Sequence, residues 1–93
     1  MNINKDSLKL FFGLKLKKIR QEKGYSLKEF SEKTQLSPSY LNEIEKGKKY
    51  PKIEKIIEIS NTLGINFNKL VSNDLEPEFN IISELMKRLD IKK

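Results

Sequence analysis

The sequence predicts an all-α fold, a compact bundle of five helices followed by a sixth helix at the C-terminus. Apolar residues recur at three- and four-residue steps through most of the chain, which is the spacing of one helix face. Serines and glycines stand where such segments begin and end. No segment alternates as a strand does, and no linker rich in Pro, Gly or Ser divides the 93 residues. We therefore expect one domain over residues 7–73 and a C-terminal amphipathic helix over residues 74–93.

The first helix is expected from about Ser7 to Lys23, and Gly24 follows it as a stop. Its apolar residues fall on one face, as required for packing against other helices. These residues are Leu8, Phe12, Leu16 and Ile19.

Two short helices come next, joined by a three-residue turn. Ser26 is the expected N-cap of the first, and Glu29 completes a capping box three positions later. Ser37 is the expected N-cap of the second, with Pro38 at its first position and Gly47 as its stop. This arrangement lays the second helix in the major groove of DNA, so the segment predicts sequence-specific DNA binding.

A fourth helix is expected to start near Pro51 and to end at Gly64, and a short fifth helix is expected from Asn66 as N-cap to Val71. The fourth helix should turn one apolar face to the core. That face is formed by Ile53, Ile56, Ile59 and Leu63.

The sixth helix, within residues 74–93, begins after a turn, and Pro77 can open it. Its apolar side chains form a stripe with heptad-like spacing. Either the stripe folds back onto the five-helix body, or it forms a dimer, as in proteins that bind two DNA half-sites. The stripe residues are Phe79, Ile82, Leu85, Met86 and Leu89.

Composition excludes several functions. The chain has no cysteine and no histidine, which removes most metal sites, the thiol nucleophile and the usual proton carrier. No nucleophile, base and oxyanion donors form a recognisable set, so we expect no enzyme activity, no metal and no cofactor. No apolar run approaches the roughly 20 residues of a membrane span, and no signal peptide is visible. We expect a cytoplasmic protein without a membrane partner.

The net charge of +6 is unevenly distributed along the chain. Residues 1–52 hold thirteen Lys and Arg against six Asp and Glu, whereas residues 53–93 hold six against seven. The basic excess therefore accompanies the two-helix motif, as a surface facing phosphates requires. A lysine-rich composition is also typical of AT-rich genomes, so the placement of the charge supports a nucleic-acid partner more than its total does.

The second helix of the motif offers polar side chains on its outer face. Because Leu41 and Ile44 point inward, Ser39, Asn42, Glu43 and Lys46 should point outward. Serine can donate or accept, glutamate can accept from a cytosine amino group, and asparagine can pair with adenine.

Tyr40 can pack on a thymine methyl group or bind a phosphate. The alternative for this face is that Glu43 only offsets nearby lysines and that Tyr40 shields the edge of the core. The helix has no arginine, so the strong bidentate contact to guanine is missing and specificity can depend more on DNA shape.

Phosphate contacts are expected from lysines after the reading helix and from the start of the preceding helix, where free N–H groups favour an anion. The serine caps can bind phosphate as well. Ordinary solvation of the Lys48–Lys49 loop is the alternative. The expected phosphate contacts are Ser26, Lys28, Ser37, Lys46, Lys48, Lys49 and Lys52.

From about Phe12 to Leu70 the sequence resembles the lambda-repressor-like helix-turn-helix family, also known as the Cro/repressor or xenobiotic-response-element family. The matching segments are residues 16–24, 37–41 and 44–47, and residues 51–65 from Pro51 through Leu63-Gly64-Ile65. The resemblance implies a five-helix bundle whose third helix reads bases, commonly in a bacterial or phage transcriptional repressor. Base contacts are implied at the start of that helix and one turn later, at Pro38, Ser39 and Glu43.

The resemblance also implies that Arg20 and Glu45 pair between the first and third helices. Two positions depart from the family pattern: Leu27 replaces a phosphate-binding glutamine, and Gln35 replaces a glycine in the turn. Glutamine is strained there if φ is positive.

The main hypothesis is a homodimeric regulator on an inverted repeat of double-stranded DNA. One alternative is an antitoxin- or adaptor-type interaction module with a toxin as its protein partner. The other is the N-terminal DNA-binding part of a longer regulator whose sensor domain is missing.

Overall fold

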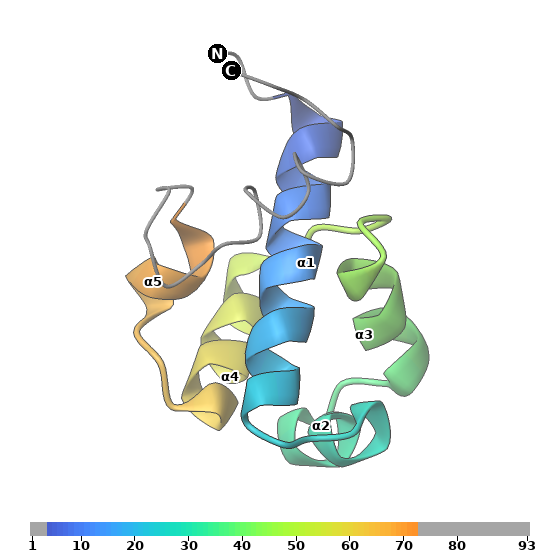
Figure 1. Cartoon of the computed structure of the whole chain (residues 1–93), viewed down its shortest axis with the longest axis vertical. Coiled ribbons are helices and arrows are strands. Elements are labelled where there is room, and N and C mark those ends of the chain that lie inside the picture. Colours follow the sequence, from blue (N-terminus) through green and yellow to red (C-terminus); the bar gives the residue numbers. More distant parts are fainter. Residues whose placement is uncertain (1–3, 73–93) are drawn as a thin grey trace.

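A computed structural model describes residues 4–72, which form five α-helices and no strand. This confirms the all-α prediction, while the expected sixth helix lies outside the described residues. The long helix α1 lies between α2 and α3 on one side and α4 and α5 on the other (Figure 1). The bounds are α1 Lys5–Glu22, α2 Leu27–Thr34, α3 Pro38–Glu45, α4 Ile53–Leu63 and α5 Phe67–Val71.

The helix ends follow from local hydrogen bonding. Ser26 and Glu29 form the predicted capping box, with Ser26 N–H to Glu29 Oε1 at 2.8 Å and Glu29 N–H to Ser26 Oγ at 3.0 Å. The Ser37 hydroxyl accepts from Tyr40 N–H at 3.0 Å. These bonds satisfy amide groups that a helix N-terminus otherwise leaves without partners. The two helices of the motif therefore start where their serines stand.

Two helices start within two residues of the expected positions. Helix α1 starts at Lys5 because the Asn4 side chain caps it, accepting from Ser7 N–H at 2.8 Å. Helix α4 starts at Ile53, two residues after Pro51, with Lys52 as an extended N-cap residue. The prediction that Ile53 belongs to the buried apolar face of α4 is wrong, because this side chain is 61% exposed.

Each of the five helices contributes to a single core within the described residues. The side chains buried to less than 2% exposure come from α1, α2, α3, α4 and α5, so removing any one helix would expose the others. They are Phe30, Leu16, Leu41, Ile44, Ile59 and Leu70.

Gly13 brings α1 and α3 unusually close together. A Cβ atom at this position would lie 2.3 Å from the Ile44 carbonyl oxygen and 2.8 Å from that of Glu45. Glycine inside a helix costs about 1 kcal/mol relative to alanine, so its presence in the middle of α1 needs a packing reason. The carbonyl groups at the end of α3 occupy the space that a side chain would need.

We expect Gly13→Ala to destabilise the protein by about 2–3 kcal/mol despite the better helix propensity of alanine, because α3 must shift to clear the methyl group. Chemical denaturation followed by circular dichroism measures this change. Lys17→Ala, at an exposed position of the same helix, is the control and should change stability by less than about 0.5 kcal/mol. A Gly13→Ala variant as stable as Lys17→Ala would contradict the tight contact.

Candidate nucleic-acid interface

A buried ion pair joins α1 to the end of α3. Arg20 Nε donates to Glu45 Oε2 at 2.7 Å and Arg20 Nη2 donates to Glu45 Oε1 at 3.0 Å. The third guanidinium nitrogen, Nη1, donates to the Tyr25 carbonyl oxygen at 2.7 Å. Both charged side chains are more than nine-tenths buried. This two-bond geometry holds α3 at one rotation about its axis as well as at one distance.

The turn between α2 and α3 is held by side chains as well as by the backbone. Gln35 has φ 61°, so the glutamine adopts the left-handed conformation that the turn requires. The Ser31 hydroxyl donates to the Leu36 carbonyl oxygen at 2.5 Å, and the Thr34 hydroxyl accepts from Leu36 N–H at 3.3 Å. Leu27 is half-buried and packs against the core. These contacts fix the angle between the two helices.

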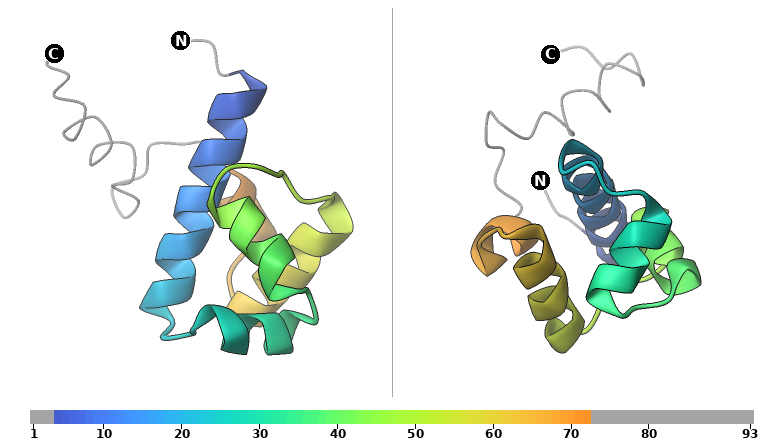
Figure 2. Two further views of the ribbon diagram at one scale, coloured as in Figure 1. Left: turned by 90° about the vertical axis from the view of Figure 1, so that its right-hand side faces the viewer. Right: turned by 90° about the horizontal axis from the view of Figure 1, so that it is seen from below.

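The outer face of α3 is directed away from the other helices (Figure 2, left). Pro38 and Ser39 are exposed at its start, while Tyr40, Asn42 and Glu43 are partly exposed. Tyr40 also packs against the core, in agreement with the alternative that it shields the core edge. The structure thus places all five expected base-reading residues on one short helix.

Glu43 has a basic partner in the loop after α3. Its Oε1 atom lies 3.1 Å from Lys49 Nζ, and the same nitrogen lies 5.7 Å from the centroid of the Tyr40 ring. The alternative that Glu43 offsets nearby lysines therefore has a specific partner in this structure.

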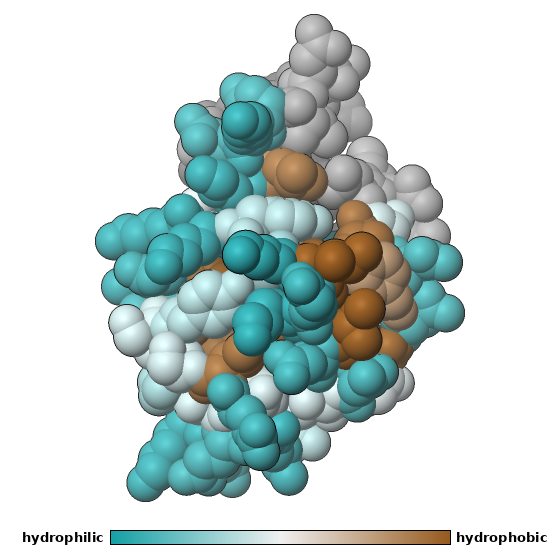
Figure 3. Space-filling view, turned by 180° about the vertical axis from the view of Figure 1, so that it is seen from behind, coloured by the Kyte–Doolittle hydropathy of each residue, from teal (hydrophilic) through white to brown (hydrophobic). Residues whose placement is uncertain are grey.

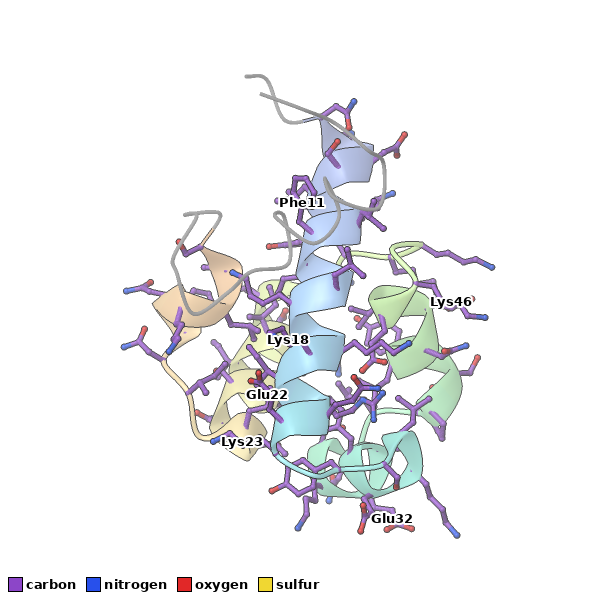
Figure 4. The ribbon with its side chains drawn as sticks, viewed as in Figure 1. Phe11, Lys18, Glu22, Lys23, Glu32 and Lys46 are labelled. Atoms are coloured by element: carbon purple, nitrogen blue, oxygen red, sulfur yellow. The ribbon has the colours of Figure 1, made fainter. Side chains whose placement is uncertain are left out.

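The expected phosphate-binding residues lie at the starts of α2 and α3 and in the segment from the end of α3 to the start of α4. They are all exposed, and the Lys46 side chain extends outward from the end of α3 (Figure 4). The Ser26 and Ser37 hydroxyls accept from backbone amides, which leaves each O–H available to donate to a phosphate oxygen.

Two ionisable groups near the site have shifted pKa values. Hydrogen bonds from the Ser26 backbone N–H and with the Ser26 side chain lower the pKa of Glu29. Burial raises the pKa of Tyr50, whose ring packs against Phe12 with centroids 4.9 Å apart. Glu29 therefore keeps its charge, and its capping bond, to lower pH than an ordinary glutamate.

Lys15 was not anticipated from the sequence as part of the framework. Its buried ammonium group donates to the carbonyl oxygens of Lys69 at 3.1 Å and Leu70 at 3.3 Å, and also to that of Ser72. These carbonyls lie at the end of α5, where a helix leaves them without intrahelical partners. The available signal was a lysine between Phe12 and Leu16 on the apolar side of α1.

A hydrophobic area lies on the other side of the molecule. Viewed from behind, apolar side chains gather where α4 and α5 lie (Figure 3). Ile53 and Ile57, one turn apart on α4, are 61% and 45% exposed. No helix among residues 4–72 is long and apolar enough to cross a membrane.

Comparison with known families and sequences agrees with this geometry. The model of a family described as helix-turn-helix matches residues 16–70. The chain is 35% identical over 68 residues to the HTH-type transcriptional regulator SinR of Bacillus subtilis. This match covers 72% of the chain and 61% of SinR. The chain therefore spans about three fifths of that relative's length. It is also 38% identical over 74 residues to the control protein C.MunI of a Mycoplasma species, covering 78% of this chain and 99% of C.MunI.

A solved structure shows the same fold. The crystal structure of the clp gene regulator ClgR from Corynebacterium glutamicum superposes with a TM-score of 0.66 at 31% identity, covering 69% of this chain and 82% of ClgR.

The buried ion pair leads to a stability prediction. Arg20→Met should lower the free energy of unfolding by about 3–5 kcal/mol, because Glu45 is left as a buried charge without its partner. Lys18→Met is the matched control on the same helix, since Lys18 forms only a surface ion pair with Glu22 at 3.4 Å (Figure 4). It should cost less than about 1 kcal/mol. Denaturant unfolding measures both variants.

DNA binding by Arg20→Met should fall as a consequence of the lost stability. A double variant, Arg20→Met with Glu45→Leu, should recover part of the stability, because apolar groups then replace both charges. Unchanged stability of the single variant would refute the structural role of the pair.

Proposed function

Because the chain belongs to the helix-turn-helix family, we propose that it is a sequence-specific transcriptional regulator that binds double-stranded DNA through α3 in the major groove. We further propose that it is a repressor and acts as a homodimer on an inverted repeat. One observation carries this proposal: α3 is fixed on α1 by a buried ion pair, while its outer face carries hydrogen-bonding side chains bordered by lysines. A rigid helix with a polar outer face is what base recognition requires.

Base recognition is assigned to the outer face of α3. Ser39 and Glu43 lie where a helix entering the groove by its N-terminus places its contacts, and Asn42 offers an amide that matches adenine. Pro38 and the edge of the Tyr40 ring supply apolar contact to a thymine methyl group. None of these groups forms the guanine contact that arginine makes, so DNA shape contributes to the choice of site.

Phosphate binding is assigned to the exposed lysines and serine caps around α3. Ser26 and Lys28 at the start of α2, and Ser37 at the start of α3, would contact the DNA backbone near helix N-termini. Lys46, Lys48 and Lys52 would contact it where the chain leaves α3. Contacts of this kind set register and affinity and carry no direct sequence information.

Dimerisation is assigned to the C-terminal half of the chain. Residues 74–93 carry an apolar stripe in the sequence, and the bundle exposes Ile53 and Ile57 on α4. A two-fold dimer would present two α3 helices to half-sites about one helical turn apart. In this arrangement residues 7–73 are the DNA-binding domain and residues 74–93 are the dimerisation element.

Selection from a random DNA duplex library tests the main proposal. We expect an enriched palindrome whose binding constant falls with salt at a slope, in log K against log salt, of about −4 to −5, because four to six phosphates are neutralised. A shuffled duplex of the same length is the control and should bind weakly. A slope near zero would contradict the phosphate contacts, and no binding even at low salt would favour the interaction-module hypothesis.

Truncation after Val71 tests the dimer. The shortened chain should be folded and monomeric, because the buried core residues of the described part of the chain all lie between Phe12 and Leu70 and are retained. Light scattering gives the mass in solution, and circular dichroism checks that the helices remain. A truncated chain that is still a dimer at the same concentration would place the interface elsewhere.

A further inference from the structure

The end of α3 is a rigid reversal of the chain. Gly47 has φ +80° and donates its N–H to the Ile44 carbonyl oxygen at 3.0 Å, while Lys48 N–H donates to the Glu43 carbonyl oxygen at 2.9 Å. This pair of bonds is the Schellman arrangement, which closes a helix with one left-handed residue. A Cβ atom on Gly47 would also lie 3.1 Å from Leu10 Cα, so the turn is packed against α1. The course of the chain just before Lys49 is therefore fixed.

This reversal carries Lys49 back over the outer face of α3. Tyr40 and Glu43 are three residues apart, so their side chains are neighbours on one face of the helix. Lys49 Nζ contacts both, at 3.1 Å from Glu43 Oε1 and 5.7 Å from the centre of the Tyr40 ring. An ion pair between two mobile surface side chains is weak. Here the fixed backbone and the aromatic ring both restrict the lysine.

A carboxylate on a reading helix needs such a partner. As it enters the groove, Glu43 approaches two rows of phosphates that repel its charge. Lys49 neutralises that charge and engages Oε1, which leaves Oε2 to accept a hydrogen bond. Cytosine presents an amino donor in the major groove and no acceptor beside it. Guanine and thymine present acceptors that would repel the carboxylate, and adenine places its N7 acceptor beside its amino donor.

We propose that Lys49 is a positioning residue for base recognition and does not act mainly as a phosphate contact. It holds Glu43 so that the carboxylate accepts from a cytosine amino group and rejects guanine and thymine at that position. This inference rests on the proposed DNA-binding function and adds the base that Glu43 selects and the residue that orients it.

The adjacent lysine provides the contrast. Lys48 is exposed, and no ion pair of its side chain is present within residues 4–72. A lysine of this kind contributes affinity for any sequence through phosphates. Loss of the Lys48 side chain should therefore reduce affinity for all sequences, whereas loss of the Lys49 side chain should reduce base preference.

The test compares Lys49→Met, Lys48→Met, Glu43→Gln and the double variant Glu43→Gln with Lys49→Met in the full chain. Affinity is measured for the selected operator and for its single-base substitutions, over a series of salt concentrations. The wild type should prefer cytosine about tenfold or more at one position of each half-site. Lys49→Met should lose most of this preference with an unchanged salt slope.

The other variants isolate the mechanism. Lys48→Met should weaken binding to all sequences equally and reduce the salt slope by about one. Glu43→Gln should lose the cytosine preference as Lys49→Met does, and the double variant should lose no more than either single variant, because the two residues act as one unit. Lys49→Arg should retain the preference, since it keeps the charge partner. Thermal unfolding confirms that the variants are folded.

The outcomes separate this inference from the proposed function. If Lys49→Met instead behaves like Lys48→Met, the positioning role is overturned while sequence-specific binding stands. An operator without a cytosine preference dependent on Glu43 also overturns it. If the wild-type chain selects no operator, the proposed function itself fails, and the inference fails with it.

Discussion

The contact between α1 and α3 is the constraint on which the rest of the interface depends. It has two parts, both centred on the end of α3. Gly13 gives the carbonyl groups of Ile44 and Glu45 room to approach the backbone of α1, and Arg20, two helical turns further on, binds the Glu45 side chain. Because the Glu45 backbone lies close to Gly13 and its carboxylate binds Arg20, sliding or rotation of α3 on α1 would disturb one of these contacts. This contact therefore determines which side chains of α3 face outward.

The ion pair is better explained by geometry than by stability. Apolar residues of similar size often replace a buried pair without loss of stability, since desolvation offsets most of the attraction between the charges. They would not impose the planar two-bond geometry that guanidinium and carboxylate share. We interpret Arg20 and Glu45 as the feature that gives α3 one orientation, with Tyr25 joined to the same guanidinium through its carbonyl. A base-reading helix needs that single orientation more than it needs additional stability.

The sequence predicted the parts of this protein that depend on local rules. Ser26, Glu29 and Ser37 mark helix starts through hydrogen bonds within one turn, and Gly47 and Gly64 mark helix ends because their φ angles are positive. What remained unpredicted depends on three-dimensional neighbours. The carbonyls that Lys15 binds lie more than 50 residues away, and the pairing of Lys49 with Glu43 depends on the path of a turn. Ile53 was misplaced because periodicity assigns it to the apolar face of α4 but does not show whether another element covers the first residue of that helix.

In the proposed complex, charge and geometry have different roles: lysines supply affinity, and helix packing positions the base contacts. Exposed lysines provide an attraction that any DNA sequence can satisfy and that salt weakens. The α3 face, without arginine, would make few strong base contacts in the proposed complex, so each one would have to be made from an accurate position. For Glu43, the proposed position depends on the placement of α3, to which Gly13 and Arg20 contribute, and on the turn at Gly47, after which Lys49 pairs with Glu43. In the proposed function, selectivity is therefore a property of packing between helices as much as of the residues that would touch the bases.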